Sequence, residues 1–259
     1  MSILRAVAKT VLPARITAQL RRVYNRTQLR RLLDPEIRER KLLMQRAFTA
    51  ITFNGISGDY AEFGCCWCNT FALAHKEIER LGVPRHLWAF DSFKGLPPAQ
   101  SADDEHPVWE EGKMTMSLGD FLSACRNKGV AESDFTVVAG FYDSTIGAET
   151  SYTGSLPTDI AFAYIDCDMY SSTTSVLEFL RKRLKHGMIV AFDDYYCTSS
   201  AALAGNRKAL LEFLDSDARF HFLPYVQFGW HGMSFQLERR ALLPATSRAP
   251  TYVPPNSSE

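Results

Sequence analysis

Residues 160–194 read IAFAYIDCDMYSSTTSVLEFLRKRLKHGMIVAFDD, and this stretch decides the fold. It opens with an apolar run of strand length at 160–165, continues with helical spacing over 172–184, and closes with a second apolar run at 188–192. Two short strands joined by one helix predict a right-handed crossover between parallel strands of one sheet. The acids that follow these two strands are Asp166, Asp168, Asp193 and Asp194.

The same alternation of strands and helices extends on both sides of this crossover. Apolar runs of strand length lie at 59–63, 87–90, 135–139, 220–223 and 233–237, and helical patterns at 69–81, 117–127 and 201–214. Strands separated by helices of about a dozen residues predict an α/β domain with a doubly wound, Rossmann-like parallel sheet and helices on both faces. We expect this domain to span residues 53–240.

Composition excludes several classes of protein. Of 259 residues, 46% are hydrophobic and 22% are charged, which is ordinary for a globular chain and excludes a disordered or collagen-like one. No stretch approaches the roughly 18 apolar residues of a membrane span, so we expect no integral membrane contact. The 29 basic and 29 acidic residues give a formal net charge of zero, so nothing in the global charge argues for a nucleic-acid partner.

The two ends of the chain differ from its middle. Residues 1–47 hold 12 Lys or Arg but only three acids, and their apolar positions recur at helical spacing. We therefore predict a basic N-terminal helical arm over residues 1–52. Its basic face suits either an anionic surface or a neighbouring subunit, and we favour a homo-oligomer formed through these helices. The proline-rich residues 241–259 are predicted to be a flexible tail.

The spacing of the six cysteines is not that of a zinc site or of a disulfide framework. Cys65, Cys66 and Cys68 fall within one turn, and no second cluster has the paired spacing that zinc requires. The N-terminus lacks the apolar run and cleavage site of a secretory signal. We therefore expect reduced thiols and a cytoplasmic protein.

The residues after the strands predict the cofactor, because open parallel sheets bind ligands beyond the carboxyl ends of their strands. The segment AEFGCCWCNT at 61–70 has one glycine where a dinucleotide loop has three, and its bulky residues would block a pyrophosphate. An acid that ends the second strand can accept hydrogen bonds from both ribose hydroxyls. These features favour S-adenosylmethionine over NAD. The strand-end residues that we expect to contact it are Glu62, Gly64, Asp91, Ser92, Gly140 and Phe141.

The spacing of the acids predicts a metal. Asp193 lies 27 residues after Asp166, so one crossover places the two side by side, with Asp194 next to them. Crowded carboxylates repel one another unless a cation compensates them, and Mg²⁺ prefers oxygen ligands. We therefore expect Asp166, Asp193 and Asp194 to bind Mg²⁺. The alternative is that Asp193 and Asp194 cap a following helix.

Four motifs resemble the macrocin O-methyltransferase family, which methylates sugar hydroxyls on natural products. They are GDYAEFGC at 58–65, WAFDSFKGLP at 88–97, AYIDCDMYSSTTSVLEFL at 163–180 and GMIVAFDDYY at 187–196. The resemblance implies a class I methyltransferase fold, S-adenosylmethionine, Mg²⁺, and often an oligomer built through N-terminal helices. It also implies that Thr70 contacts the cofactor. The sequence departs from the family at Cys68 and Asn69, where glycines are usual.

The expected reaction is methyl transfer to a hydroxyl of a sugar, glycoside or glycosylated natural product. A metal would lower the pKa of that hydroxyl, and a nearby carboxylate would take its proton. Asp166 or Asp168 is the expected base, with His231 and His106 as alternatives. Two other functions stay open: a non-catalytic carbohydrate-binding or scaffolding protein, and an NAD-dependent sugar-modifying enzyme. The aromatic residues that could stack on a sugar are Trp109, Tyr195, Tyr196 and Trp230.

Overall fold

A mixed seven-stranded sheet forms the centre of the molecule. The computed structural model describes residues 35–148, 150, 152–200 and 202–242. The strands lie in the order β3-β2-β1-β4-β5-β7-β6, and the predicted doubly wound sheet is confirmed. Neighbouring strands run parallel from β3 to β5, whereas β7 is antiparallel to both β5 and β6. The strands are β1 Asp59–Phe63, β2 Leu87–Asp91, β3 Phe135–Ala139, β4 Ile160–Ile165, β5 Ile189–Phe192, β6 Phe220–Phe228 and β7 Gly232–Arg239.

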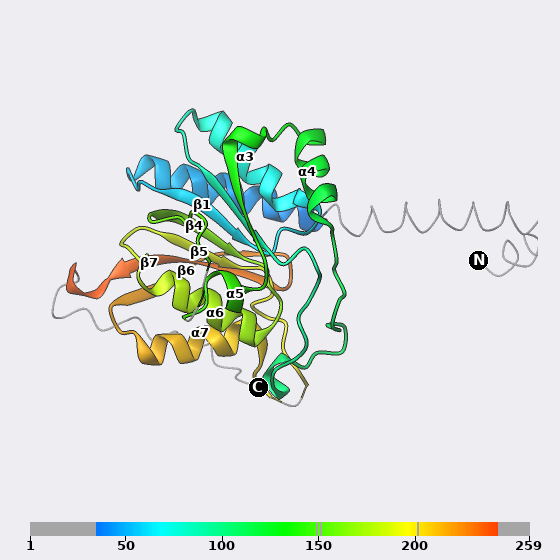
Figure 1. Cartoon of the computed structure of the whole chain (residues 1–259). Coiled ribbons are helices and arrows are strands. Elements are labelled where there is room, and N and C mark those ends of the chain that lie inside the picture. Colours follow the sequence, from blue (N-terminus) through cyan, green and yellow to red (C-terminus); the bar gives the residue numbers. More distant parts are fainter. Residues whose placement is uncertain (1–34, 149, 151, 201, 243–259) are drawn as a thin grey trace, which may run out of the picture.

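Helices cover both faces of this sheet (Figure 1). A helix over residues 35–53 lies with α3 and α4 on one face, and α5, α6 and α7 lie on the other. Both faces of the sheet are therefore buried, which explains why strands such as β4 are apolar throughout. Within the described ranges no helix is both long and apolar enough to cross a membrane. The named helices are α3 Asn69–Leu81, α4 Leu118–Asn127, α5 Tyr142–Thr145, α6 Tyr170–Arg181 and α7 Gly205–Ser216.

The 35–53 helix contributes to the hydrophobic core. Its side chains Leu43, Met44 and Phe48 are fully buried, and the Phe48 ring centre lies 5.4 Å from that of Phe162 in β4. The described end of the predicted 1–52 arm therefore packs on the sheet. Residues 1–34, and with them most of the arm and its predicted subunit contacts, lie outside the described residues, as do residues 243–259 of the predicted tail.

The register of the parallel strands aligns their carboxyl ends. Phe63 pairs with Phe90 on one side and with Ile165 on the other, and Ile165 pairs with Phe192. The strand order reverses between β1 and β4, which is where open α/β sheets bind ligands. The loops that follow these four strands therefore meet at one edge of the sheet.

Candidate functional site

A cavity opens at this edge, beside the point where the strand order reverses. Its free space is about 800 Å³, part of it open to solvent. Loops from all four strands β1 to β4 contribute to its wall. Of the residues predicted from sequence, the wall includes Gly64, Asp91, Ser92, Gly140, Phe141, Asp166 and Asp168.

Asp91 is held rigidly in the cavity wall by the backbone. Its Oδ2 accepts a hydrogen bond from the Cys65 amide at 2.8 Å, and its Oδ1 accepts one from the Phe93 amide at 2.7 Å. Burial raises the pKa of Asp91, although both amide bonds favour its ionised form. Each oxygen of an ionised carboxylate can accept a second hydrogen bond. Asp91 is therefore a fixed acceptor for hydroxyl groups of a ligand.

Gly64 allows two loops of the cavity wall to touch. It has a φ of +92°, and a Cβ at this position would lie 1.9 Å from the carbonyl oxygen of Asp166. No other residue could occupy this position without separating the loops that follow β1 and β4. Cys68, by contrast, adopts a φ of +54° with a side chain present, at a position where the resembled family usually has glycine.

Two residues that we expected to contact the cofactor are buried and do not line the cavity. Glu62 is 2% exposed and accepts a hydrogen bond from the hydroxyl of Tyr60, and burial raises its pKa well above the ordinary value. Thr70 is buried in the first turn of α3. Neither is among the residues that line the cavity in the described part of the chain.

Carboxylates crowd one end of the cavity, as the sequence predicts. Burial and mutual repulsion raise the pKa of Asp166 and Asp194 well above the ordinary value, and they raise the pKa of Asp168 to about 7. Asp194 Oδ1 accepts a hydrogen bond from the Cys197 thiol at 3.4 Å. The other oxygen of Asp194, Oδ2, is buried and has no hydrogen-bond partner among the described residues.

Asp168 is in an unusual backbone conformation. Its φ is +59°, which costs energy for a residue with a side chain and is enriched at functional sites. The fully buried Asn206 stabilises this conformation, because its amide Nδ2 donates to the Asp168 carbonyl at 3.2 Å. The Asp168 backbone is therefore fixed in this conformation by Asn206.

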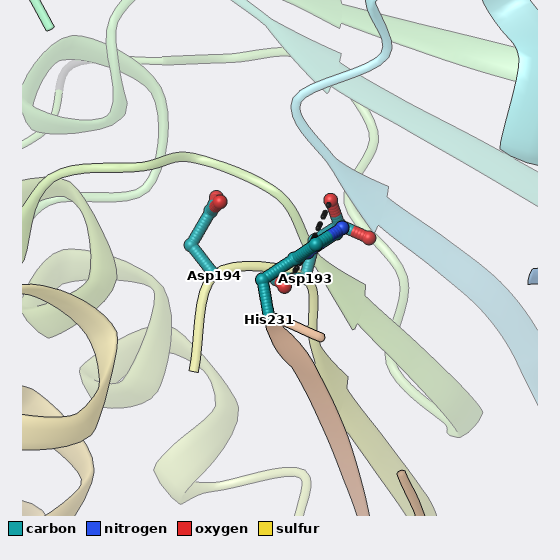
Figure 2. A group of neighbouring side chains, drawn as sticks. All are labelled: Asp193, Asp194 and His231. Carbon is teal, nitrogen blue, oxygen red and sulfur yellow. Dashed lines mark hydrogen bonds and ion pairs between the residues drawn. The ribbon is translucent and has the colours of Figure 1, made fainter. Parts of the chain in front are cut away.

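Asp193, Asp194 and His231 form a group whose ligand atoms all lie within 4.8 Å of one another (Figure 2). The imidazole lies beside Asp193, and its Nδ1 bonds to the Asp193 backbone carbonyl at 2.6 Å. Nδ1 also lies 3.6 Å from Asp193 Oδ2, and Nε2 lies 4.0 Å from Glu36 Oε1. Asp166, which we predicted in the metal set, lies at the cavity wall next to this group but is not part of it.

Arg40 is a site residue that the sequence reasoning did not find. From the 35–53 helix its Nε donates to Asp193 Oδ1 at 2.9 Å and its Nη2 to Asp193 Oδ2 at 2.6 Å. Although burial opposes it, this pairing raises the pKa of Arg40. One signal was present in the sequence: Arg40 lies three and four residues before the buried Leu43 and Met44, so it belongs to the apolar face of its helix.

The donor set fits a hard divalent cation. The Arg40 guanidinium lowers the pKa of Asp166 and Asp194, but burial and repulsion outweigh it. Arg40 interacts with three carboxyl groups, those of Asp166, Asp193 and Asp194, so these groups when ionised carry more negative charge than this one cation balances. Carboxylate oxygens are the ligands that Mg²⁺ prefers, and the unpartnered Oδ2 of Asp194 is such an oxygen.

Comparisons with known proteins agree with this geometry. The sequence model of the macrocin O-methyltransferase family (TylF) matches residues 37–214. A Streptomyces olivaceus enzyme, 8-demethyl-8-(2,3-dimethoxy-alpha-L-rhamnosyl)-tetracenomycin-C 4'-O-methyltransferase, is 27% identical over 162 residues, which are 59% of this chain and 58% of that protein.

Solved structures show the same fold. The O-methyltransferase NovP matches with a TM-score of 0.64 and 20% identity, over 76% of this chain and 79% of that chain. The calicheamicin methyltransferase CalS11 matches with a TM-score of 0.58 and 22% identity, over 76% of this chain and 77% of that chain. The expected class I methyltransferase fold is confirmed.

Proposed function

This chain belongs to the macrocin O-methyltransferase family, and on that basis we propose that it transfers a methyl group from S-adenosylmethionine to a hydroxyl of a sugar, glycoside or glycosylated natural product. One observation carries the proposal. A small-molecule cavity with a fixed ribose acceptor, Asp91, opens directly onto a buried cluster of carboxylates. The proposed cofactor site and the acidic side chains are thus adjacent at one edge of the sheet.

S-adenosylmethionine suits the cavity because its binding needs no room for a pyrophosphate near the backbone. Asp91 would accept hydrogen bonds from the ribose hydroxyls, and Gly140 and Phe141 lie on the same wall. Cys66 and Met114 also line it, and they supply apolar surface.

Replacement of Asp91 by Ala should weaken binding of S-adenosylmethionine by about 1–3 kcal/mol, because hydrogen bonds to a charged acceptor are lost. Isothermal titration calorimetry measures this directly. Asp215→Ala is the matched control, since Asp215 is an exposed acid of α7 outside the cavity wall. Equal affinity in the two variants would remove Asp91 from the cofactor site.

Mg²⁺ would be held by Asp193, Asp194 and Asp166, with His231 as a further donor close to the first two. When bound, the cation supplies a Lewis acid that lowers the pKa of an acceptor hydroxyl. The protein's own part is to bring the carboxylates together and to keep their oxygens out of bulk water.

Asp168 is the proposed general base. It lies on the cavity wall, its backbone is fixed by Asn206, and its carboxyl group interacts electrostatically with those of Asp193 and Asp194. From that place it would accept the proton of an acceptor hydroxyl while the cavity holds the oxygen in line with the methyl group. Asp166 shares the wall and is the second candidate. His231 is less suited, because it is not among the described residues that line the cavity.

Exposed aromatic side chains near the acids in sequence could contact a sugar acceptor. Trp230 is 69% exposed and directly precedes His231 in the turn between β6 and β7, and Tyr196 lies just after the acid pair of β5. Aromatic faces of this kind can pack against a sugar ring. We also propose a homo-oligomer formed through the N-terminal helical arm, residues 1–52, and a cytoplasmic location, which the six free cysteines support.

The test of function is a methyl-transfer assay. The full chain is incubated with S-adenosylmethionine, Mg²⁺ and a panel of free sugars, rhamnosides and glycosylated aromatic compounds. We expect methylated product and an equal amount of S-adenosylhomocysteine with at least one glycoside. Binding of S-adenosylmethionine without turnover on any acceptor would favour the carbohydrate-binding alternative, and binding of NAD instead would favour the sugar-modifying oxidoreductase.

A further inference from the structure

Arg40 is bonded to an oxygen pair that the divalent cation of the proposed function would need. We propose that Arg40 is a built-in competitor of this cation: its guanidinium holds Asp193 in the metal-free enzyme and releases it when the cation binds. The inference rests on the proposed Mg²⁺ site, and it concerns a residue of the 35–53 helix rather than of the sheet edge.

The hydrogen bonds of Asp193 are the first argument. Oδ1 accepts from Arg40 Nε at 2.9 Å and also from the hydroxyl of Tyr164, so both of its acceptor positions are filled. Oδ2 accepts from Arg40 Nη2 at 2.6 Å. A paired guanidinium and carboxylate lie in one plane with two parallel bonds. One acceptor position of Oδ2 stays open, so a cation can bind both oxygens of Asp193 only if Arg40 moves.

The neighbouring acid shows the opposite state. Asp194 Oδ2 is buried without a partner in the described residues. Two adjacent residues of one loop thus differ: one is neutralised by an internal cation, and the other is not. A divalent ion would bind Asp194 first and would then compete with Arg40 for Asp193.

Charge is the second argument. A guanidinium within hydrogen-bond distance of Asp193 repels a divalent cation that approaches the same oxygens. At the effective dielectric constant of about 20 that applies near protein sites, unit charges a few ångströms apart interact by several kcal/mol. Loss of the Arg40 charge should therefore strengthen cation binding rather than weaken it.

Arg40 also has a second acceptor within reach. Its Nη1 lies 3.6 Å from Glu36 Oε2, one turn earlier on the same helix, and the side chain of Glu36 is 32% exposed. A modest rotation of the Arg40 side chain would exchange Asp193 for Glu36. The released guanidinium would then remain paired, so the exchange leaves no buried charge uncompensated.

The test measures cation binding, not turnover. Mn²⁺ is titrated by calorimetry into the full-length wild type, Arg40→Met, Arg40→Lys and the control Arg46→Met, which removes an exposed arginine from the same helix. We expect Arg40→Met to bind Mn²⁺ about tenfold more tightly or better, because a repelling charge is gone. Arg40→Lys should fall between it and the wild type, and Arg46→Met should equal the wild type.

Equal or weaker Mn²⁺ binding by Arg40→Met would overturn the proposal, as would the absence of binding in every variant.

Arg40→Met leaves Asp193 without its partner and could fold poorly, so a second measurement uses the wild type alone. The Nε–H signal of Arg40, identified by its absence in Arg40→Lys, is followed by ¹⁵N nuclear magnetic resonance while Mg²⁺ is added. We expect it to shift or to vanish; an unchanged signal with Mg²⁺ bound would overturn the competition. Neither readout needs an acceptor, so failure of the methyl-transfer assay and failure of this inference are distinguishable.

Discussion

Treatment with EDTA is expected to abolish the proposed methyl transfer, while the affinity of the protein for S-adenosylmethionine stays nearly unchanged. A sugar hydroxyl is a poor nucleophile, and a Lewis acid contributes several kcal/mol toward its ionisation. Loss of the cation should therefore cost a factor of about 1,000 or more in rate. The cofactor is expected to bind through Asp91, which does not belong to the Asp193–Asp194–His231 group.

Asp194→Ala should reproduce the effect of EDTA, and added Mg²⁺ should not restore activity. Asp194→Asn should be milder, because an amide oxygen can still bind a hard cation. The comparison is made by initial rates at saturating cofactor, together with calorimetry of S-adenosylmethionine for each variant. Full activity in EDTA would show that the carboxylates act only as proton acceptors, and the metal proposal would then be withdrawn.

Much of the sheet edge could be predicted from local sequence. Each strand from β1 to β5 is a short apolar run, and parallel pairing puts the residues after these runs together. Asp91, Asp166 and Asp193 could therefore be assigned to one edge without a structure. Gly64 was also identifiable, although the reason, contact with the Asp166 carbonyl, is a property of the fold.

Other features depend on contacts between distant parts of the chain. Arg40 and Asp193 are separated by 153 positions, and no local pattern links them. Residues 1–47 are rich in Lys and Arg, so their composition indicates a basic surface and does not single out Arg40. The burial of Leu43 and Met44, which share its helix face, becomes clear only in the structure. Glu62 follows the pattern of a cofactor ligand, yet it lies inside a strand whose side chains alternate between faces, and it is bonded to Tyr60. The antiparallel insertion of β7 beside β5 likewise depends on tertiary packing rather than on the strand pattern.

Asp168→Asn is expected to lower the turnover number by a factor of about 100 to 10,000, the range that a positioned general base contributes. The amide has nearly the shape of the carboxylate but cannot accept the proton of the acceptor hydroxyl. Affinity for S-adenosylmethionine and for Mn²⁺ should change little, since neither the Asp91 contacts nor the group of Asp193, Asp194 and His231 is altered. The measurement is the turnover number at saturating acceptor, with both affinities determined for the same preparation.

The melting temperature of Asp168→Asn distinguishes a catalytic role of Asp168 from a structural one. Burial and the neighbouring charge of Asp193 raise the pKa of Asp168 to about 7, so its ionised form is disfavoured in the folded enzyme. Removal of that charge should leave the melting temperature of Asp168→Asn equal to that of the wild type or above it. Asp143→Asn is the control, because Asp143 lines the same cavity and bonds to Ser175 outside the acid cluster. If Asp168→Asn turns over slowly but keeps its melting temperature, and Asp143→Asn stays active, Asp168 is identified as the general base. An active Asp168→Asn would transfer that role to Asp166, which shares the cavity wall and is repelled by the same acids.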